Sequence, residues 1–439
     1  MFRNINIFLV VFLLFPRLLL SQETMEISMT NLRAGIAKAD ITPSILIPLG
    51  GYTSRTGPAT GIRDPLHVTA IVFDDGIKQA AIVSLDLIQV NASLGKQIYE
   101  TVSAVTGIPA QCIILNASHT HGSPWPWTDD DYAREITVKT AGAVKMAQSG
   151  LVPVSLDYGE GNIDFNVSRR ILDENGKSIV CLNPNGIADN RLKVLRIDNS
   201  DAISPMAVIA HAVCHPNVFR QLNTKVSADF PGEAKTFIEN TFGQNTTAMF
   251  LQGCAGDIRA NLPDKNNPER IHSFGRSGDE ADMIWCGWTT GTEAVKVASR
   301  LRIYDQVIKR PKCFKIRAGE DSVLIKADPL KLENILFPRE KIINGKVSLS
   351  LKIIILEDIC FVGIPGEPVV EYGLKIEEIL KSRGMKHVFV LGYLDGDLGY
   401  IPVDHMFDEE GFEVAQSSVL PGCEQIILEG VIRLFDSLK

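Results

Sequence analysis

Short apolar runs alternate with longer amphipathic stretches along this chain, and this alternation constrains the fold more than any other feature. Runs with the length of a buried β-strand occur at 67–73, 80–88, 112–118, 192–197, 206–214, 247–253, 350–358, 359–364 and 387–393. Stretches with the length and polarity pattern of a surface helix occur at 93–107, 131–150, 231–242, 289–303, 369–384 and 422–439. Strands that alternate with helices predict an α/β fold. We expect one large layered domain with a mixed β-sheet.

The N-terminal residues have the pattern of an export signal. An early arginine precedes the apolar stretch 7–20, which is shorter than the roughly 20 residues that a membrane-spanning helix needs. We therefore expect a signal peptide over 1–21, a linker over 22–33 and the folded domain over 34–439, with an uncleaved N-terminal anchor as the alternative. No later segment reaches about 18 uninterrupted apolar residues, so we expect a soluble protein exported to the periplasm or the medium.

Charge and motif content exclude several functional classes. The net charge is -8 and the isoelectric point is near 5.6, whereas nucleic-acid binding requires a basic surface. The sequence contains no G-x-S-x-G, P-loop or H-E-x-x-H motif. It therefore lacks the usual signatures of serine hydrolases, P-loop nucleotide-binding proteins and helix-based zinc proteases.

The cysteines have the pattern of buried apolar residues. Four of the eight lie inside or at the end of apolar runs, namely Cys112, Cys214, Cys254 and Cys360. No C-x-x-C pair indicates a zinc site built from cysteine. We expect at most one or two disulfides, whose pairing the spacing does not determine.

Polar or glycine-rich segments end several of the apolar runs. They are ASHTH (117–121), CHPN (214–217), GCAGD (253–257), GIPGE (363–367) and LDGDLGY (394–400). Ligands of α/β sheets bind beyond the carboxyl ends of the strands. The sequence therefore predicts one shared site at these strand ends.

Histidines are the candidate metal ligands of that site. His119 and His121 are separated by one residue, so in an extended segment both imidazoles would point to the same face. His215 lies at a strand end directly before a proline, whereas His211 has the pattern of a core histidine with satisfied hydrogen bonds. Ordinary hydrogen-bonded histidines are the alternative for the H-x-H pair.

Two carboxylates accompany the histidines. Glu367 lies between Gly366 and Pro368, a rigid frame for a ligand, although a surface glutamate at a helix start is the alternative because acids favour helix N-termini. Asp257 follows a glycine-rich strand end, where it is able to orient a histidine ligand. A simple strand-to-loop turn would also use these residue types.

The ordered set of motifs resembles the catalytic N-terminal domain of the neutral/alkaline non-lysosomal ceramidases, from about Ala34 to the C-terminus. The motifs that carry the resemblance are AGIAKADITP, PLGGY, RDPLHVTAIVFDD, VSLDLI, ASHTHGSP, NVSRR, AVCHPN, SADFPGEA, GCAGDIRAN, GIPGEPV and GYIPVDHMFDEEGFEV. Their order and spacing are more specific than any single motif.

The resemblance implies one Zn²⁺ per chain. By position, His119, His215, Glu367 and Tyr400 match the family's zinc ligands. Tyrosine is outside the usual zinc set of Cys, His, Asp and Glu, so Tyr400 is a ligand only by resemblance. The family's site keeps a position open for water, which is typical of a catalytic zinc.

The implied reaction is amide hydrolysis by metal-activated water, whose pKa zinc lowers from about 15.7 to about 7. His121 is the candidate donor to the oxyanion, and His121 or Asp257 is the candidate proton donor to the leaving amine. Arg169 matches an arginine of the family's cleft that would bind a substrate oxygen. The alternative for Arg169 is one of two adjacent surface arginines.

Two features depart from the family's pattern. Arg259 in GDIRAN occupies the position of a serine proposed as an active-site residue in the characterised ceramidases. Either the serine is dispensable for zinc-hydroxide chemistry, or the substrate differs. In the second case Arg259 suggests an anionic or more polar substrate, because its planar guanidinium fork suits carboxylate or phosphate. The chain is also expected to lack the family's C-terminal immunoglobulin-like domain.

The combined interpretation is an exported zinc-dependent amidohydrolase that cleaves the N-acyl amide of ceramide or of a related N-acylated lipid. One alternative is a zinc hydrolase of another amide or ester, such as an N-acyl amino sugar or a peptide. The other is a non-catalytic ligand-binding homologue. Acyl-chain preference, oligomeric state and the metal used in the cell are not determined by the sequence.

Overall fold

The computed structural model describes residues 31–199, 204–243, 245–263, 275–305, 314–328, 344–396 and 398–439. The predicted signal peptide, 1–21, and most of the predicted linker lie outside the described residues. The folded part begins slightly earlier than expected, because Arg33 already belongs to the first strand, β1.

The main β-sheet has the strand order β12-β10-β9-β6-β1-β3-β4-β5. Its strands are β1 (Arg33–Asp40), β3 (His67–Asp74), β4 (Gln79–Leu85), β5 (Ile113–Ala117), β6 (Val152–Asn162), β9 (Arg191–Asn199), β10 (Ala207–Ala212) and β12 (Thr247–Gln252). β4 runs parallel to β5 and β10 to β12, while the other neighbours are antiparallel. The predicted mixed sheet is confirmed, and its parallel pairs lie at its two edges.

A second sheet has the order β14-β15-β16-β18. Its strands are β14 (Ile316–Lys326), β15 (Lys346–Leu356), β16 (Ile359–Pro365) and β18 (His387–Leu394). Side chains of successive strand residues point to opposite faces. Accordingly Phe389 and Leu391 join the core shared with the main sheet, whereas Val388 and Val390 pack in a second core with α6 (Val370–Ser382) and α9 (Cys423–Ser437).

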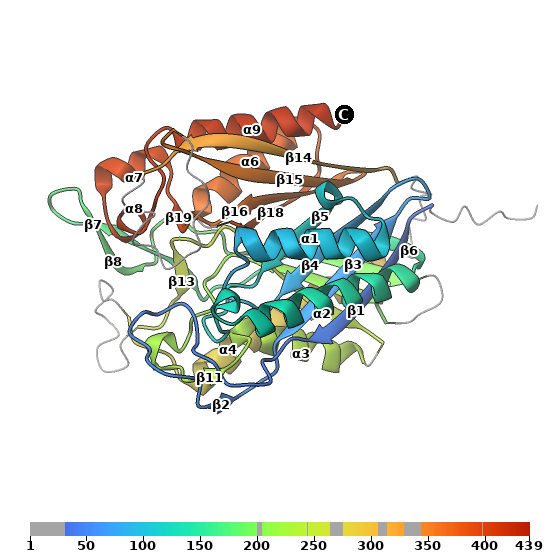
Figure 1. Ribbon diagram of the computed structural model, residues 1–439, viewed down its shortest axis with the longest axis horizontal. Helices are drawn as coiled ribbons and strands as arrows, with labels where there is room; N and C mark the ends of the chain where they lie inside the picture. Colours follow the sequence, from blue (N-terminus) through green and yellow to red (C-terminus); the bar gives the residue numbers. More distant parts are fainter. Residues whose placement is uncertain are drawn as a thin grey trace, which may run out of the picture.

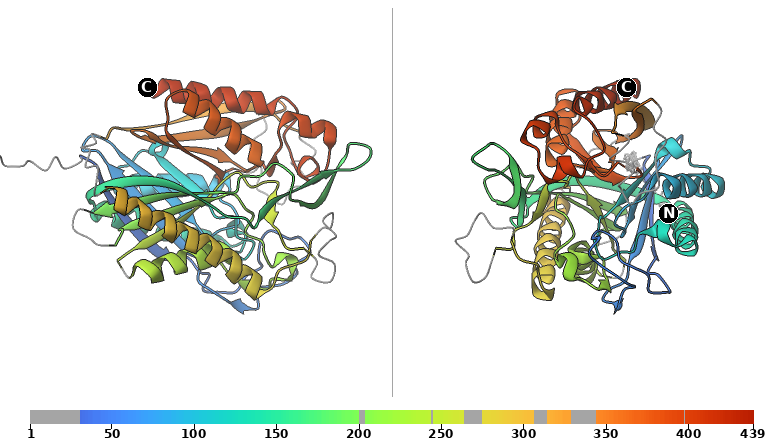
Figure 2. Two further views of the ribbon diagram at one scale, coloured as in Figure 1. Left: turned by 180° about the vertical axis from the view of Figure 1, so that it is seen from behind. Right: turned by 60° about the vertical axis from the view of Figure 1, so that its left-hand side comes forward.

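Helices cover the outer faces of both sheets, which gives a layered arrangement (Figures 1 and 2). α2 (Asp130–Ser149) packs on β1 and β3 beside α1 (Ala92–Thr106), and α4 (Glu280–Asp305) packs on β6 and β9 beside α3 (Asp229–Phe242). α6 and α9 lie over the second sheet, at the top of Figure 1.

The main sheet curls until its two edge strands meet at Asn116 of β5. The carboxamide of Asn116 accepts from the backbone N–H of Gln252 in β12 at 2.8 Å and donates to the Gln252 carbonyl at 3.1 Å. It also donates to the carbonyl oxygen of Gly392 in β18 at 2.7 Å. One fully buried side chain therefore joins the carboxyl ends of three strands from the two sheets.

Short elements gather at the end of the molecule where those strands finish, at the left of Figure 1. They are β2 (Gly61–Ile62), β7 (Asn166–Leu172), β8 (Ser178–Asn183), β11 (Lys225–Val226), β13 (Ile258–Ala260), β17 (Glu367–Pro368), β19 (Tyr400–Ile401), α7 (Asp404–Glu409) and α8 (Phe412–Ala415). Single 3-10 turns occur at Ala110–Cys112, Pro126–Thr128 and Arg220–Leu222. This end collects the loops that carry the predicted site residues.

Every predicted strand and helix is present, with α4 beginning at Glu280, well before the predicted Thr289. The strands β1, β6, β7, β8 and β14 were not predicted, because their mixed polar and apolar residues form no continuous apolar run. The seven described cysteines are all free and buried, as expected for small apolar residues. Within the described ranges, no helix is long and apolar enough to cross a membrane.

We predict that Asn116→Ala lowers the free energy of unfolding by about 3 kcal/mol, because it leaves a buried N–H and two buried carbonyls without partners. Urea denaturation followed by circular dichroism measures this change. Asn185→Ala is the matched control, since Asn185 is exposed in the turn after β8 and should lose less than about 0.5 kcal/mol. Equal losses in the two variants would contradict the role assigned to Asn116.

Candidate metal centre

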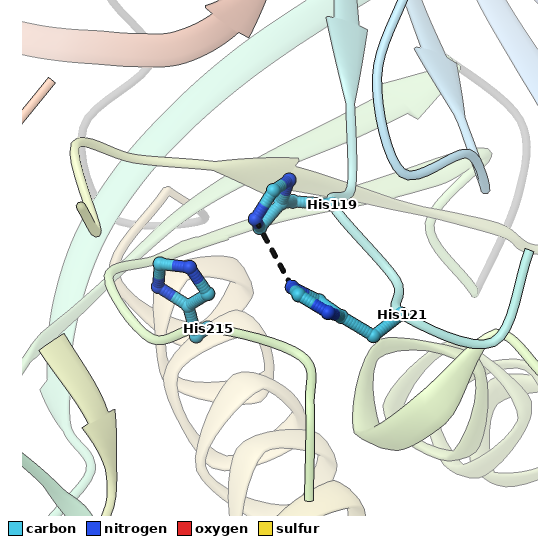
Figure 3. A group of neighbouring side chains, drawn as sticks. All are labelled: His119, His121 and His215. Carbon is cyan, nitrogen blue, oxygen red and sulfur yellow. Dashed lines mark hydrogen bonds between the residues drawn. The ribbon is translucent and has the colours of Figure 1, made fainter. Parts of the chain in front are cut away.

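Three buried histidines lie together at the predicted strand ends (Figure 3). His119 and His121 follow β5, and His215 follows β10. One ring nitrogen from each histidine lies within 4.8 Å of the others. The Nε2 atoms of His119 and His121 are 3.2 Å apart. The predicted convergence of the polar strand ends is thus confirmed for these residues.

The H-x-H segment is not extended, contrary to our expectation. His119 has a φ of 64°, in the left-handed region that non-glycine residues rarely adopt. Its ring stacks on Tyr393, with centroids 4.2 Å apart, and Tyr393 has a φ of 54°. The two histidines therefore meet because the chain turns at His119 and Tyr393 supports the turned ring. Strained residues of this kind concentrate at functional sites.

Backbone carbonyls set the tautomers of two of the histidines. Nδ1 of His119 donates to the carbonyl oxygen of Ile88 at 2.7 Å, and Nδ1 of His215 donates to that of Ala255 at 2.6 Å. A carbonyl only accepts, so Nδ1 carries the proton and Nε2 of the neutral ring presents a lone pair. Burial lowers the pKa of His215 to about 4, which keeps its ring neutral near pH 7.

Glu367 completes a cluster of acceptor atoms. Its Oε2 lies 3.3 Å from Nε2 of His119 and 3.4 Å from Nε2 of His215. Among the described residues, neither Oε2 of Glu367 nor Nε2 of His215 has a hydrogen-bond partner. Lone pairs that face one another without an intervening hydrogen repel, and a cation among them removes the repulsion. The residues present therefore fit a metal ion with nitrogen and oxygen ligands.

Tyr400 is held beside this cluster by the backbone. β17 and β19 pair in parallel, which places Glu367 opposite Tyr400. The Tyr400 ring stacks on His215 with centroids 6.4 Å apart. Burial and then the charge of Glu367 raise the pKa of Tyr400, so the phenol is protonated at neutral pH without a metal.

His121 faces the cluster from the opposite side. Its ring packs on Tyr52 with centroids 4.9 Å apart, and its Nδ1 has no partner in the described part of the chain. Burial, followed by the neighbouring histidines, lowers the pKa of His121 well below its usual value. Gly51 is required here, because a Cβ at that position would lie 2.1 Å from Nδ1 of His121. His121 is thus a neutral imidazole with an available ring nitrogen.

Arg169 is buried, so the surface alternative for the arginine pair is wrong. Its Nε donates to Oε1 of Glu413 at 2.8 Å, and Arg170 donates to Oε2 of the same carboxylate at 2.5 Å. The guanidinium of Arg169 lies 5.3 Å from the centroid of the Tyr400 ring. Consecutive strand residues normally point to opposite faces, yet Arg169 and Arg170 both bind Glu413. The β7–β8 pairing shifts its register between Ser168 and Arg170, at the same point of the strand.

The remaining predicted residues occupy different positions. Asp257 accepts from the backbone N–H of Val370 at 2.8 Å, at the start of α6, and burial raises its pKa to about 7. The histidines are oriented by carbonyls and not by Asp257. Arg259 is buried in β13, one residue after Ile258, whose carbonyl accepts from the N–H of His215. His211 is a core residue, as expected, and its Nε2 donates to the carbonyl of Val390 at 3.1 Å. Its Nδ1 has no partner among the described residues, so its hydrogen bonds are only half satisfied.

Sequence reasoning missed Tyr52, Arg55, Tyr393 and Glu413. Tyr52 lies in the PLGGY motif, and Tyr393 ends the predicted strand 387–393. A single tyrosine in a sequence does not indicate that its ring packs on a histidine. Arg55 donates to the carbonyl oxygens of Gly50, His121 and Arg220 at 2.8, 2.5 and 2.6 Å. Such backbone contacts leave no pattern in a sequence.

Comparison with known proteins identifies the family. The sequence model described as neutral/alkaline non-lysosomal ceramidase, N-terminal, matches residues 32–270, more than half of the chain and the part that carries all three clustered histidines. The crystal structure of neutral ceramidase from Pseudomonas aeruginosa has a TM-score of 0.75 at 17% identity, covering 93% of this chain and 75% of that chain. A structure described as ceramidase complexed with C2 has a TM-score of 0.75 at 17% identity, covering 93% and 76%. At this identity the structures establish a shared fold, and the sequence match establishes that this chain belongs to the neutral/alkaline non-lysosomal ceramidase family.

Proposed function

We propose that this protein is a zinc-dependent amidohydrolase that cleaves the N-acyl amide bond of ceramide or of a related N-acylated lipid. The observation that carries the proposal is the convergence of Nε2 of His119, Nε2 of His215 and Oε2 of Glu367, buried and without a hydrogen between them. Family membership supports amide hydrolysis as the reaction class. The predicted signal peptide supports export as the cellular setting of this activity.

His119, His215 and Glu367 would hold the zinc, with Tyr400 beside them as the fourth candidate ligand. Two histidines and one carboxylate are a common catalytic zinc set. When bound, zinc supplies a water with a pKa of about 7 and a Lewis acid for the amide carbonyl. The carbonyls of Ile88 and Ala255 keep the Nδ1 protons away from the ligand atoms.

Proton transfer is assigned to His121. It is neutral, buried and 3.2 Å from His119, so its ring is placed to accept a proton from the attacking water and to deliver it to the leaving nitrogen. Asp257 was the other candidate, but its carboxylate caps α6, so we assign it a structural role. Nη2 of Arg169 is buried and has no hydrogen-bond partner in the described ranges, and this group would donate to a substrate oxygen.

We predict that the purified protein binds one Zn²⁺ per chain and that His215→Ala weakens binding by at least about 100-fold, since a ligand is lost. Plasma mass spectrometry after dialysis against a graded zinc chelator gives both values. His405→Ala is the control, because His405 lies on α7 with its side chain 49% exposed, bonded to Glu371 and Glu409. Full zinc retention by His215→Ala would contradict the assigned site.

We predict that the protein releases fatty acid from N-octanoylsphingosine, and that His121→Ala lowers kcat by about 10²- to 10⁴-fold while it keeps one zinc per chain. Mass spectrometry of the released acid and the zinc assay above are run on the same preparations. Loss of zinc in His121→Ala would make His121 a ligand instead of a proton-transfer group. Zinc binding without release of acid from any amide would favour the non-catalytic alternative.

A further inference from the structure

The geometry points to an anionic substrate: we infer that the site accepts an N-acyl compound carrying a carboxylate or another acidic group next to its amide, bound by Arg169 and Arg55. This inference rests on the proposed function and names the substrate class of the same site. It concerns the part of the substrate beyond the scissile bond.

The two arginines flank the histidine cluster in matching arrangements. The guanidinium of Arg169 lies 5.3 Å from the centroid of Tyr400, whose ring stacks on His215. The guanidinium of Arg55 lies 4.9 Å from the centroid of Tyr52, whose ring packs on His121. Each arginine is therefore one aromatic ring away from the candidate metal centre. Both arginines act electrostatically on Tyr52, which indicates that they lie near one another.

Each arginine keeps a buried donor that the described residues leave unused, namely Nη2 of Arg169 and Nε of Arg55. Several of the other donors have partners. Phe412 covers Arg169 at 5.0 Å while Glu413 holds its Nε, and three backbone carbonyls hold Arg55. A guanidinium fixed on its other sides presents its free N–H groups in a defined direction, which is the arrangement that binds carboxylate or phosphate.

The described ion pairs balance the charges of Arg169 and Arg170 but not the charge of Arg55. Glu413 neutralises Arg169 and Arg170 together, with Glu409 as the second partner of Arg170. The described ion pairs give Arg55 no carboxylate. Burial lowers the pKa of Arg55 to about 10, which still leaves it charged near pH 7.

Asp229 is the carboxylate that acts electrostatically on Arg55. Its oxygens accept from the backbone N–H groups of Val218 and Phe230, and burial raises its pKa to about 7. Asp229 is therefore only partly ionised at neutral pH and is occupied by the backbone. Arg55 is half-buried, and a partly desolvated cation without a full counter-charge is unfavourable. An acidic substrate group would supply the missing charge.

The test uses two amides that differ in charge and little else, N-lauroylglycine and N-lauroylethanolamine. They share the acyl chain and the amide, and they differ in a carboxylate against a hydroxymethyl group. We expect the kcat/KM of the wild-type protein to be at least about tenfold higher for the glycine amide, as one charge-assisted contact provides. We expect calorimetry on His121→Ala, which would consume substrate slowly, to show the same preference in Kd.

Variants of Arg169 and Arg55 test which side chain causes the preference for the glycine amide. Arg169→Gln should bring the ratio of kcat/KM values toward one, while Arg169→Lys, which keeps the charge without the fork, should retain part of it. Arg55→Gln provides an independent second site, with circular dichroism to confirm folding. Arg134→Gln is the control, because Arg134 is 69% exposed on α2 and pairs with Asp131, and it should leave the ratio unchanged.

The outcomes separate this inference from the proposed function. Weaker binding and slower cleavage of the glycine amide than of the ethanolamide would overturn the inference and leave amide hydrolysis standing. Tighter binding of the glycine amide without release of acid from either amide or from N-octanoylsphingosine would support the inference and overturn the proposed hydrolysis. A preference that survives in both Arg169→Gln and Arg55→Gln would overturn the assignment to these residues.

Discussion

The site depends on the hydrogen bonds of one buried carboxamide, that of Asn116. It joins β5 to β12 and to β18, so the edges of the curled main sheet and the second sheet are held at a common point. His119 and His121 follow β5 directly, and Tyr393, which supports His119, is the residue after Gly392. A shift of these strands relative to one another would separate the histidine from the ring that supports it. Buried polar networks of this kind specify one arrangement because every alternative leaves a polar group unsatisfied.

Backbone strain is concentrated around the same point. Seven described non-glycine residues have positive φ, and four of them, His119, Arg220, Asp229 and Tyr393, border the histidine cluster or act electrostatically on Tyr52 beside it. Each such conformation costs roughly 1 kcal/mol or more and persists only where surrounding packing determines it. The two sheets and their cores supply that packing. The favourable packing of the two sheets therefore offsets the conformational strain of the turned loop that brings the candidate ligand atoms together.

The electrostatics of the site follow from burial. Burial keeps His121 and His215 neutral. Arg169 is paired with Glu413, whereas the described ion pairs give Arg55 no carboxylate. Neutral imidazoles suit metal binding, since protonated rings have no lone pair to offer. The same low-dielectric surroundings strengthen any contact between an arginine and an acidic substrate group. The proposed metal binding and the proposed substrate preference would both follow from placing polar groups inside the end of a layered core.

The sequence by itself determined the α/β class, the positions of the long apolar strands and amphipathic helices, and the strand ends that carry His119, His215 and Glu367. These features are local or periodic, so a pattern of residues records them. Only the tertiary structure decided the turn at His119, the burial of Arg169 on Glu413, the capping role of Asp257 and the positions of Tyr52 and Arg55. Those depend on contacts between segments far apart in the chain, such as Arg169 with Glu413, and the free energy of such a contact is set by burial and geometry that no local pattern encodes.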